Sequence, residues 1–539
     1  MKKESIVLIV FWLFLILGQV TFVHATFMEQ ILINTKAISL ANSVTADPPG
    51  HMSIHYNPAG LTLMDEGIQI SQGFALARIE RTYKFFPGEA NEFFNPATDP
   101  LAYGKGSVDN GRIYIPFVGP IDLKVLTAPV PFGMSFKPFG SKITFANAIY
   151  APFAGGFEHN NEDASKYQGE AVYLQHMIYA SPSFGLQLTP ELSIGASIGF
   201  GQSAMGAETS VRAPGIIHLT KMLREISKYM PVPLNVDIGI FENAATMEFN
   251  ARDDFSPSFN VGLLWQPCSG FSFGIVYQSP ISVDMKGKYN IRYEPNIYKM
   301  VEWLDTQTTL QDSYWKLDHQ TKFVEYGDIK IEDFKYPQRV QVGMMIRPIH
   351  QLKLMLDLHW ANWSSTEEYV MKFDQDIQLI MMTEMLGYEG PGDVLRYPKD
   401  FDDTLHLSFG IEYQLFDYLA LRFGYEDRQT CAKDHYFDLF SLPDVKFFGT
   451  GLGIKIKQGL ELDLGFAYLT YNDYEVPNNT STNLNSLKPK EPIYSPYAGL
   501  NYETSFNAYI GTMNVTMSFE VMKDMLERQL MKLDFLFGG

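Results

Sequence analysis

Apolar and polar residues alternate one by one in six well-separated segments of the chain. These segments are residues 192–200, 271–277, 352–360, 405–413, 419–425 and 460–468. Successive side chains of a strand point to opposite faces, so each segment predicts a strand with one oily face and one polar or small face. A soluble sandwich gives the same pattern with its oily faces inward. Aromatic residues at the segment ends favour a membrane barrel instead, in which the oily face meets lipid.

The connections between these segments alternate between short and long. Short turns fall near residues 140–142, 189–191, 266–270, 348–350, 416–418 and 457–459. Long connections span roughly residues 87–125, 157–168, 213–245, 291–336, 361–402, 427–445 and 472–503. Outer-membrane barrels combine tight periplasmic turns with long extracellular loops. Seven long loops predict an all-β fold, a 14-stranded antiparallel transmembrane barrel over residues 66–521 with its last strand at about 506–521.

Both ends of the chain differ from the barrel segments. Lys2 and Lys3 precede an apolar run from Ile6 to Val20, so residues 1–25 predict a cleaved signal peptide. No second run of about 18 apolar residues follows, which leaves strands to span the membrane. At the other end, residues 522–539 continue past the last predicted strand, and their apolar residues recur at helical spacing. We expect a short periplasmic helix there.

Composition and net charge exclude several classes of partner and of protein. The net charge of −19 argues against a nucleic-acid partner, which needs a basic surface. The 46% hydrophobic content and the mean hydropathy of −0.09 fit neither a disordered chain nor a bundle of membrane helices. Cys268 and Cys431 are the only cysteines, and they fall in predicted turns at opposite ends of the barrel, so we expect no disulfide between them. The sequence predicts no metal site and no cofactor.

Residues 26–65 have the character of a plug rather than of a strand. Within them, residues 47–61 contain two turns rich in proline and glycine, which disfavour both helix and strand. The same stretch carries Ile54, Tyr56, Ala59 and Leu61, so it is apolar enough to be buried. We predict that it fills the barrel lumen as a hatch.

Several short motifs occur in an order that resembles the FadL family of outer-membrane transporters for long-chain fatty acids and other hydrophobic compounds. The hatch motif of that family is similar to Asn57-Pro58-Ala59-Gly60. Further similar segments are residues 151–157, 181–185 with 192–196, 277–280 with 286–288, 357–364, and 421–425 with 442–444. Each motif is short, but their shared order extends from residue 57 to residue 444.

The resemblance implies a route for a hydrophobic cargo across the outer membrane. External loops would capture the cargo, the lumen would bind it, and movement of the hatch would release it sideways through a gap at a kinked third strand. Pro152, Phe153, Gly155 and Gly156 lie in that strand and are our candidates for the lateral opening. Glycines weaken strand pairing, although simple barrel curvature explains them equally well.

Candidate residues for cargo binding come from the loops and from the lumen. Ile216, Leu219, Leu223 and Ile226 recur at helical spacing in the third long loop, where they either capture the cargo or seat a loop helix on the rim. Arg422 faces the lumen by alternation and is our candidate for a cargo carboxylate. A salt bridge to Glu412 or Glu461 is the alternative role for this arginine.

Three other functions compete with fatty acid transport. Uptake of aromatic hydrocarbons uses the same fold, whereas a general porin or surface-interaction barrel needs no plug. An enzyme is disfavoured because His359 and His406 face the lumen without a serine motif, so we assign no catalytic residue. We therefore expect a monomer whose partners are a long-chain fatty acid or another hydrophobic small molecule and the outer-membrane lipid.

Overall fold

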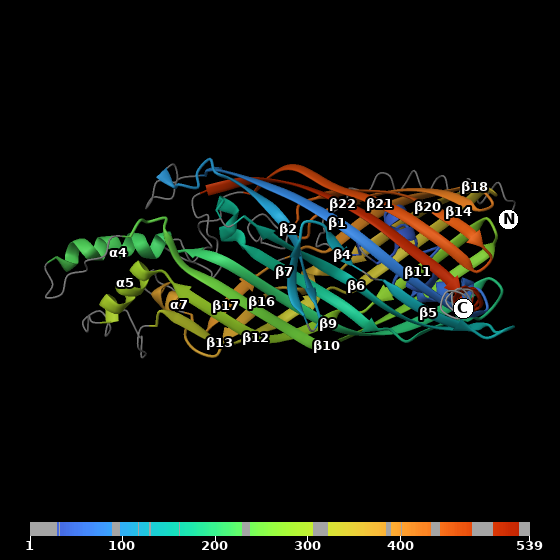
Figure 1. Ribbon diagram of the computed structural model, residues 1–539, viewed down its shortest axis with the longest axis horizontal. Coiled ribbons are helices and arrows are strands. Elements are labelled where there is room, and N and C mark those ends of the chain that lie inside the picture. The colour runs from blue at the N-terminus through green and yellow to red at the C-terminus, as the bar shows by residue number, and fades with distance from the viewer. Residues whose placement is uncertain are drawn as a thin grey trace, which may run out of the picture.

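The structure is a computed structural model. It describes residues 30–31, 33–88, 98–116, 118–128, 131–160, 162–228, 238–305, 322–383, 390–399, 401–432, 442–476 and 500–527. These residues form one elongated, closed barrel with the N-terminal segment inside one end and helices α4, α5 and α7 at the other (Figure 1). We call the first end, where the short turns lie, the turn end, and the second the loop end.

Within the described residues the strand segments occupy fourteen positions around the barrel, each antiparallel to its neighbours. Eight positions hold one strand each: β1 (Gly67–Pro87), β6 (Ile143–His159), β9 (Leu192–Arg212), β10 (Asn243–Cys268), β19 (Leu419–Arg428), β20 (Val445–Lys457), β21 (Leu460–Val476) and β22 (Leu500–Ser518). Pairing of β1 with β22, from Gln69 opposite Ser518 to Pro87 opposite Leu500, closes the barrel. This pairing joins the first strand to the last, so the sheet has no terminal edge strand, as a membrane requires.

The other six positions are divided between shorter strands. The second holds β2 (Lys105–Ile115), β3 (Gly119–Leu123), β4 (Leu126–Ala128) and β5 (Phe132–Lys137). The remaining five are β7 (Ala171–Ala180) with β8 (Ser183–Gln187), β11 (Phe271–Gln278) with β12 (Ile281–Tyr293), β13 (Val324–Tyr336) with β14 (Arg339–Ile349), β15 (Leu352–Ala361) with β16 (Glu368–Phe373), and β17 (Val394–Pro398) with β18 (Thr404–Phe416). The prediction of a 14-stranded barrel is confirmed.

Helices occur inside the barrel and at its loop end. The inner ones are α2 (Thr35–Ser39), η1 (Gly50–Met52), α3 (Ser53–Tyr56) and η2 (Pro58–Leu63). Those of the connections are η4 (Ala164–Gln168), α4 (Pro214–Ser227), α5 (Pro295–Asp305), η5 (Trp363–Ser365) and α7 (Gln378–Met382). Over the described part of the chain, no helix has the length and apolar character needed to cross a bilayer.

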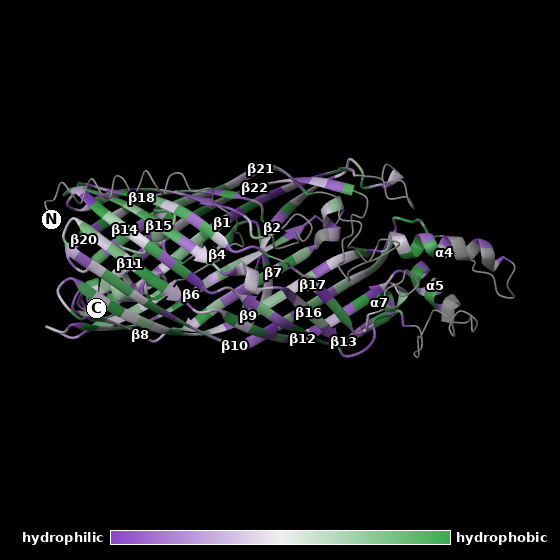
Figure 2. Cartoon of the chain, turned by 180° about the vertical axis from the view of Figure 1, so that it is seen from behind, coloured by the Kyte–Doolittle hydropathy of each residue, from purple (hydrophilic) through white to green (hydrophobic). Residues whose placement is uncertain are grey.

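The direction of the apolar face reverses along the strands. In the turn-end half of β10, Phe259 and Trp265 point outward and are 46% and 44% exposed. Beyond a register shift between Asp253 and Ser256, Phe249 and Ala251 of the same strand are buried inside. In Figure 2 apolar residues are denser along the strands of the turn-end half than along those of the loop-end half. We infer that lipid surrounds the turn-end half and that water surrounds the loop-end half.

This reversal explains why some predicted boundaries between strands and long connections were wrong. The six short turns lie where we predicted them, but the predicted connection 87–125 contains β2 and β3, and 361–402 contains β16 and β17. Because these segments turn their apolar residues inward, a search for outward-facing oily strands does not find them. The last strand ends at Ser518, and residues 519–527 are helical. The predicted signal peptide and the rest of the C-terminal tail lie outside the described residues.

Candidate functional site

The N-terminal segment from residue 33 to residue 64, which we call the hatch, fills the lumen at the turn end. Its apolar residues pack with the inner wall in one cluster, and Ile33, Leu40, Ile54 and Tyr56 in it are fully buried. The hatch motif lies in the middle of this packing, since the side chain of Asn57 caps η2 by accepting from the Ala59 amide. The prediction that the segment plugs the barrel agrees with this packing.

Asn57 also fastens the hatch to itself and to the wall. Its side-chain amide donates to the carbonyl of Thr45 at 2.9 Å and to the carbonyl of Leu263 on β10 at 3.1 Å. Alanine at this position would leave buried carbonyls without their donor, which typically costs about 1–3 kcal/mol each. A larger residue in place of Gly60 would clash with Pro48, because a Cβ there would lie 2.2 Å from the side chain of Pro48.

A ring of inward-facing glycines gives the hatch its space. At each of them a Cβ would come within 2.4 Å of a hatch atom. They are Gly195, Gly262, Gly274, Gly410, Gly424, Gly449 and Gly451, on β9, β10, β11, β18, β19 and β20. The small residues of the alternating segments therefore leave room for the hatch. The alternation predicted a polar or small face but did not indicate this role.

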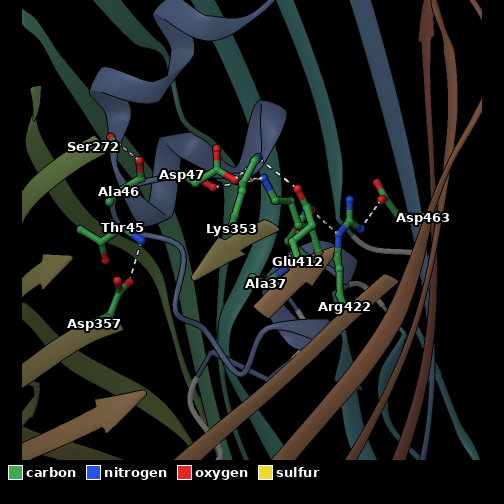
Figure 3. A network of polar contacts seen from close by, with 12 residues as sticks. Ala37, Thr45, Ala46, Asp47, Ser272, Lys353, Asp357, Glu412, Arg422 and Asp463 are labelled. Atoms are coloured by element: carbon green, nitrogen blue, oxygen red, sulfur yellow. Dashed lines mark hydrogen bonds and ion pairs between the residues drawn. The ribbon is translucent and has the colours of Figure 1, made fainter. Parts of the chain in front are cut away.

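A buried network of charges joins the hatch to the wall (Figure 3). The carboxylate of Asp47 lies 2.8 Å from the ammonium groups of both Lys36 and Lys353. Lys353 on β15 also reaches Glu412 on β18 at 3.0 Å. Burial alone would raise the pKa of Asp47, but Lys353 and Lys36 outweigh it and hold that pKa well below its ordinary value. Asp47 is therefore a charged anchor of the hatch.

Arg422 extends the same network away from the hatch. Its Nε donates to Glu412 at 2.8 Å, and its Nη1 donates to Asp463 on β21. The side chain is 9% exposed, and alternation placed it correctly inside the lumen. These two ion pairs match the alternative role, a lumen salt bridge with Glu412, although the second carboxylate is Asp463 rather than Glu461. Binding of a cargo carboxylate by Arg422 stays a prediction.

Polar contacts elsewhere hold the hatch at its other faces. The amide of Thr45 donates to Asp357 at 2.6 Å, and Ser272 donates to the carbonyl of Ala46 at 2.6 Å (Figure 3). On a third side, Thr62 donates to Ser193 at 3.0 Å. Many neutral hydrogen bonds and one charged network therefore position the plug.

The third barrel strand, β6, is broken in register beside the hatch. Tyr150 lies opposite Ile178 of β7, but the next pair is Phe153 opposite His176, so one extra residue sits at Ala151–Pro152. A bulge of this kind shifts the side-chain alternation by one residue. Accordingly Tyr150 and Phe153 are both buried. The amide of Gln30 donates to the Pro152 carbonyl at 2.9 Å, so the start of the described chain lies at the bulge.

The backbone ladder is also interrupted on the other side of β6. β5 pairs with it as far as Phe132 opposite Ile149, and β2 resumes only at Gly111 opposite Phe157. Among the described residues, none on that side forms a ladder pair with the stretch between. Bulge and missing partner coincide in the outer wall at the edge of the lipid-facing half.

The two glycines of this strand have a different place from the one predicted. Gly155 and Gly156 pair regularly with Leu174 and Tyr173, so the bulge lies three residues before them. A Cβ on Gly156 would lie 2.5 Å from the Arg112 carbonyl, because the β2–β3 hairpin crosses the outer wall there (Figure 1). Close approach of that hairpin, rather than weakened pairing, explains Gly156.

Apolar side chains fill the loop end above the bulge. This loop-end cluster combines inner-wall residues such as Phe153, Leu174, Met205 and Tyr336 with residues of the loop helices such as Ile216, Ile217, Ile297, Met300 and Trp363. Ile216 is buried and Leu219 packs against the cluster, whereas the side chains of Leu223 and Ile226 lie outside the described residues. The predicted helical stripe in the third long loop corresponds to α4, and the fourth long loop contains α5.

The described residues suggest no other chemistry. They contain no group of three or more histidine, cysteine or acidic side chains placed to hold a metal ion. Cys268 is exposed and Cys431 is buried, and neither forms a disulfide.

Comparisons with known proteins agree with this arrangement. The family described as "Outer membrane protein transport protein (OMPP1/FadL/TodX)" matches residues 16–519. An outer membrane protein of Neisseria meningitidis serogroup B is 22% identical over 90% of this chain and 95% of its own length. Outer membrane protein P1 of Haemophilus influenzae is also 22% identical, over 51% of this chain and 52% of its own length.

Two solved structures show the same fold. A Pseudomonas aeruginosa FadL homologue aligns with a TM-score of 0.66 at 15% identity, covering 92% of this chain and all of its own. The Pseudomonas putida toluene transporter TodX aligns with a TM-score of 0.57 at 14% identity, covering 89% of this chain and 98% of its own.

Proposed function

The chain belongs to the OMPP1/FadL/TodX family of outer membrane transport proteins, which are channels for hydrophobic compounds and not enzymes, and from this premise we propose that it takes up long-chain fatty acids or similar amphiphiles. In the proposed route the loop helices capture the cargo, the loop-end cluster receives it, and the hatch rearranges. The cargo then leaves sideways into the outer membrane at the bulge of β6.

One observation carries the lateral route. The bulge at Ala151–Pro152, the missing strand partner beside it and the contact from Gln30 all lie at one point in the wall. Physical chemistry favours an exit there. At about 0.8 kcal/mol per buried methylene, releasing a long acyl chain into water costs on the order of 10 kcal/mol. An exit into the bilayer avoids that cost.

Removal of the bulge tests the route. Deletion of Pro152 leaves one residue per partner between Tyr150 and Phe153, so β6 can pair regularly with β7. We expect uptake of radiolabelled oleate by cells carrying the variant to fall about tenfold or more. Binding of oleate to the purified protein should stay within twofold, because the loop-end cluster is intact. Deletion of Ser141, in the β5–β6 turn, is the control for shortening the chain. Unchanged uptake by the Pro152 deletion would refute lateral exit at this bulge.

A neutral aromatic cargo is the second candidate. The structural comparison includes a toluene transporter, and the loop-end cluster is rich in aromatic rings such as Phe153, Phe334, Tyr336 and Tyr369. Competition between labelled oleate and toluene on the purified protein separates the two. Saturable oleate binding supports an amphiphile carrier, and toluene binding alone supports a hydrocarbon channel. Binding of neither, together with steady conductance in planar bilayers, would leave a porin.

A further inference from the structure

The β2–β3 hairpin leaves the barrel wall beside the bulge of β6. In the described structure β2 still pairs with β6 at Gly111, opposite Phe157, and beyond this point it pairs only with β3. The chain returns to the wall at Leu126, opposite Ala77 of β1. Between the two points the hairpin crosses the outside of β6 and lies against β7 (Figure 1). It therefore covers the stretch of β6 that has no ladder partner on this side.

An aromatic stack holds the hairpin on the outer wall. Val172 and Leu174 of β7 belong to the loop-end cluster, so Tyr173 between them points outward, yet only 2% of it is exposed. Its ring stacks on that of Tyr114 in the hairpin, with centroids 5.6 Å apart and planes at 17°. The Tyr173 hydroxyl also donates to Asn250 of β10 at 3.0 Å. The hairpin thus buries a side chain that would otherwise face solvent.

Two glycines make the wall flat beneath this stack. Gly156 of β6 and Gly206 of β9 are the cross-strand partners of Tyr173. A Cβ on Gly206 would lie 2.5 Å from the Tyr173 ring, and one on Gly156 would lie 2.5 Å from the Arg112 carbonyl. Within the hairpin, Nε and Nη2 of Arg112 donate to the two carboxylate oxygens of Asp122 at 2.6 and 2.7 Å. This double contact joins the two strands, so we expect the hairpin to move as one unit.

Other residues of the hairpin reach the inner side of the wall. Ile113 and Leu123 pack against an apolar cluster formed by inward-facing residues of β20, β21 and β22, and the same cluster contains Ile31. Ile31 follows Gln30, whose amide donates to the Pro152 carbonyl in the bulge. Contacts of the hairpin therefore extend from the outer face of β7 to the residues at the bulge. Side chains, rather than a backbone ladder, close this part of the wall.

We propose that the β2–β3 hairpin is the gate of the lateral exit and sets the width of the cargo that leaves there. This inference rests on the proposed function and adds the part of the wall that moves. Opening there separates a ring stack and apolar side chains, and it breaks no ladder of backbone hydrogen bonds, which lipid could not replace. A narrow acyl chain needs only a displacement of Ile113 and Leu123. A bulky group requires Tyr114 to leave Tyr173.

Shortening the hairpin tests the gate. In the shortened variant an Asn-Gly turn replaces residues 112–122 and joins Gly111 to Leu123, which are cross-strand partners, so the wall pairs of β2 and β4 remain. Cells carrying it are given oleate or a fatty acid that ends in a pyrene ring. We expect the uptake ratio of the pyrene acid to oleate to rise about tenfold. Oleate binding to the purified protein should stay within twofold, because the loop-end cluster is intact.

Point variants separate the gate from a general effect of shortening the chain. Tyr114→Ala removes the ring stack, so we expect the uptake ratio to rise several-fold. Tyr114→Phe keeps the stack and should behave like the unaltered protein. Tyr326→Ala is the matched control, because it removes an aromatic ring of β13 that is 74% exposed.

Movement of the hairpin can be measured independently of transport. Val118 at its tip is 72% exposed, and Ser282 of β12 is exposed on the outer wall, so both accept spin labels as cysteines. Exposed Cys268 is replaced by serine, whereas Cys431 is buried. We expect the distance between the labels to lengthen when oleate is added and in Tyr114→Ala without oleate.

Each contrary result has a distinct meaning. An unchanged uptake ratio in the shortened variant would overturn the gate while leaving transport of hydrophobic cargo intact. Loss of oleate binding in that variant would show a structural role of the hairpin and overturn the gate as well. An unchanged label distance with oleate would show that the hairpin stays docked, which also contradicts it. Neither binding nor uptake of oleate by the unaltered protein would overturn the proposed function together with the gate.

Discussion

Single residues of the hatch are held by partners far away in sequence. Asp47 and Lys353 are 306 residues apart, yet their ion pair is buried. Charges in such a position are costly unless they are paired, and removing one partner typically costs about 3–5 kcal/mol. The network around Asp47 therefore acts as a latch that keeps the hatch in one position.

Substitution of Lys353 tests the latch. Lys353→Met leaves Asp47 with Lys36 and Glu412 with Arg422, so we expect the docked hatch to lose about 3 kcal/mol, the lower end of the range for a broken buried pair. The prediction is more frequent channel opening in planar bilayers and faster proteolysis of the hatch. Lys372→Met is the control, because its pair with Glu332 lies on the exposed outer wall. Equal behaviour of the two variants would contradict the latch.

The pKa of Asp47 predicts how the latch responds to acid. A depressed carboxyl pKa contributes stability above its unfolded value, and this contribution is lost only as the pH falls through the folded value. The folded pKa of Asp47 lies well below the ordinary one, so the latch should persist between about pH 5 and 8. The difference in channel opening between Lys353→Met and the unaltered protein should therefore vary little over that range.

Alternation alone predicted that Arg422 faces the lumen, and the structure places it there. A salt bridge with Glu412 could also be predicted, because the strands of the two residues are neighbours joined by a short turn. The register places Glu412 opposite Arg422. The pairing of Arg422 with Asp463 was not predictable, because it depends on strand register across β20, and the pairing of Lys353 with Asp47 was not, because it depends on how the hatch folds.

At the scale of strands, the same alternation of apolar and polar residues occurs with two opposite orientations. Near the turn end, glycines and polar residues face the hatch while apolar residues face outward, and toward the loop end the apolar residues face inward. The sequence predicted the first kind of strand, because aromatic residues mark its outer face. It did not predict the second kind, because alternation with charged residues is equally typical of loops and helices. The bulge in β6 was predicted for the correct strand, and Pro152, one of the four candidates, lies in it; Gly155 and Gly156 do not, since a regular pair can also contain glycine.

The glycine ring gives a test at this scale. A Cβ at Gly424 would lie 2.1 Å from the carbonyl carbon of Leu40 in the hatch backbone, so Gly424→Ala should displace the hatch without unfolding the barrel. We expect larger conductance and an unchanged heat-resistant barrel band on gels. Gly511→Ala is the control, because nothing lies within 4 Å of its Cβ position. A hatch as protected from protease in Gly424→Ala as in the control would show that the ring is not needed for docking.

At the scale of the whole molecule, binding and exit lie at different levels of one lumen. The loop-end cluster lies above the hatch, and the bulge of β6 lies beside Phe153 of that cluster. Two mechanisms fit this order. Either the cargo passes through the bulge with the hatch still in place, or movement of the hatch must first clear the way. The family resemblance implies the second mechanism, movement of the hatch. The latch provides a physical basis for this mechanism, because it holds the hatch in one position until its ion pairs break.

Locking the hatch to the wall distinguishes these mechanisms. The hydroxyls of Thr62 and Ser193 are 3.0 Å apart, so Thr62→Cys with Ser193→Cys places two sulfurs close enough for a disulfide between hatch and barrel. Exposed Cys268 is replaced by serine to prevent mispairing. If the hatch must move, oxidation should abolish oleate uptake, dithiothreitol should restore it, and binding should persist throughout. Thr62→Cys alone should not respond to oxidant. Undiminished uptake by the locked protein would instead mean that cargo leaves through the bulge over a stationary hatch, and the latch would then serve only to keep the lumen sealed.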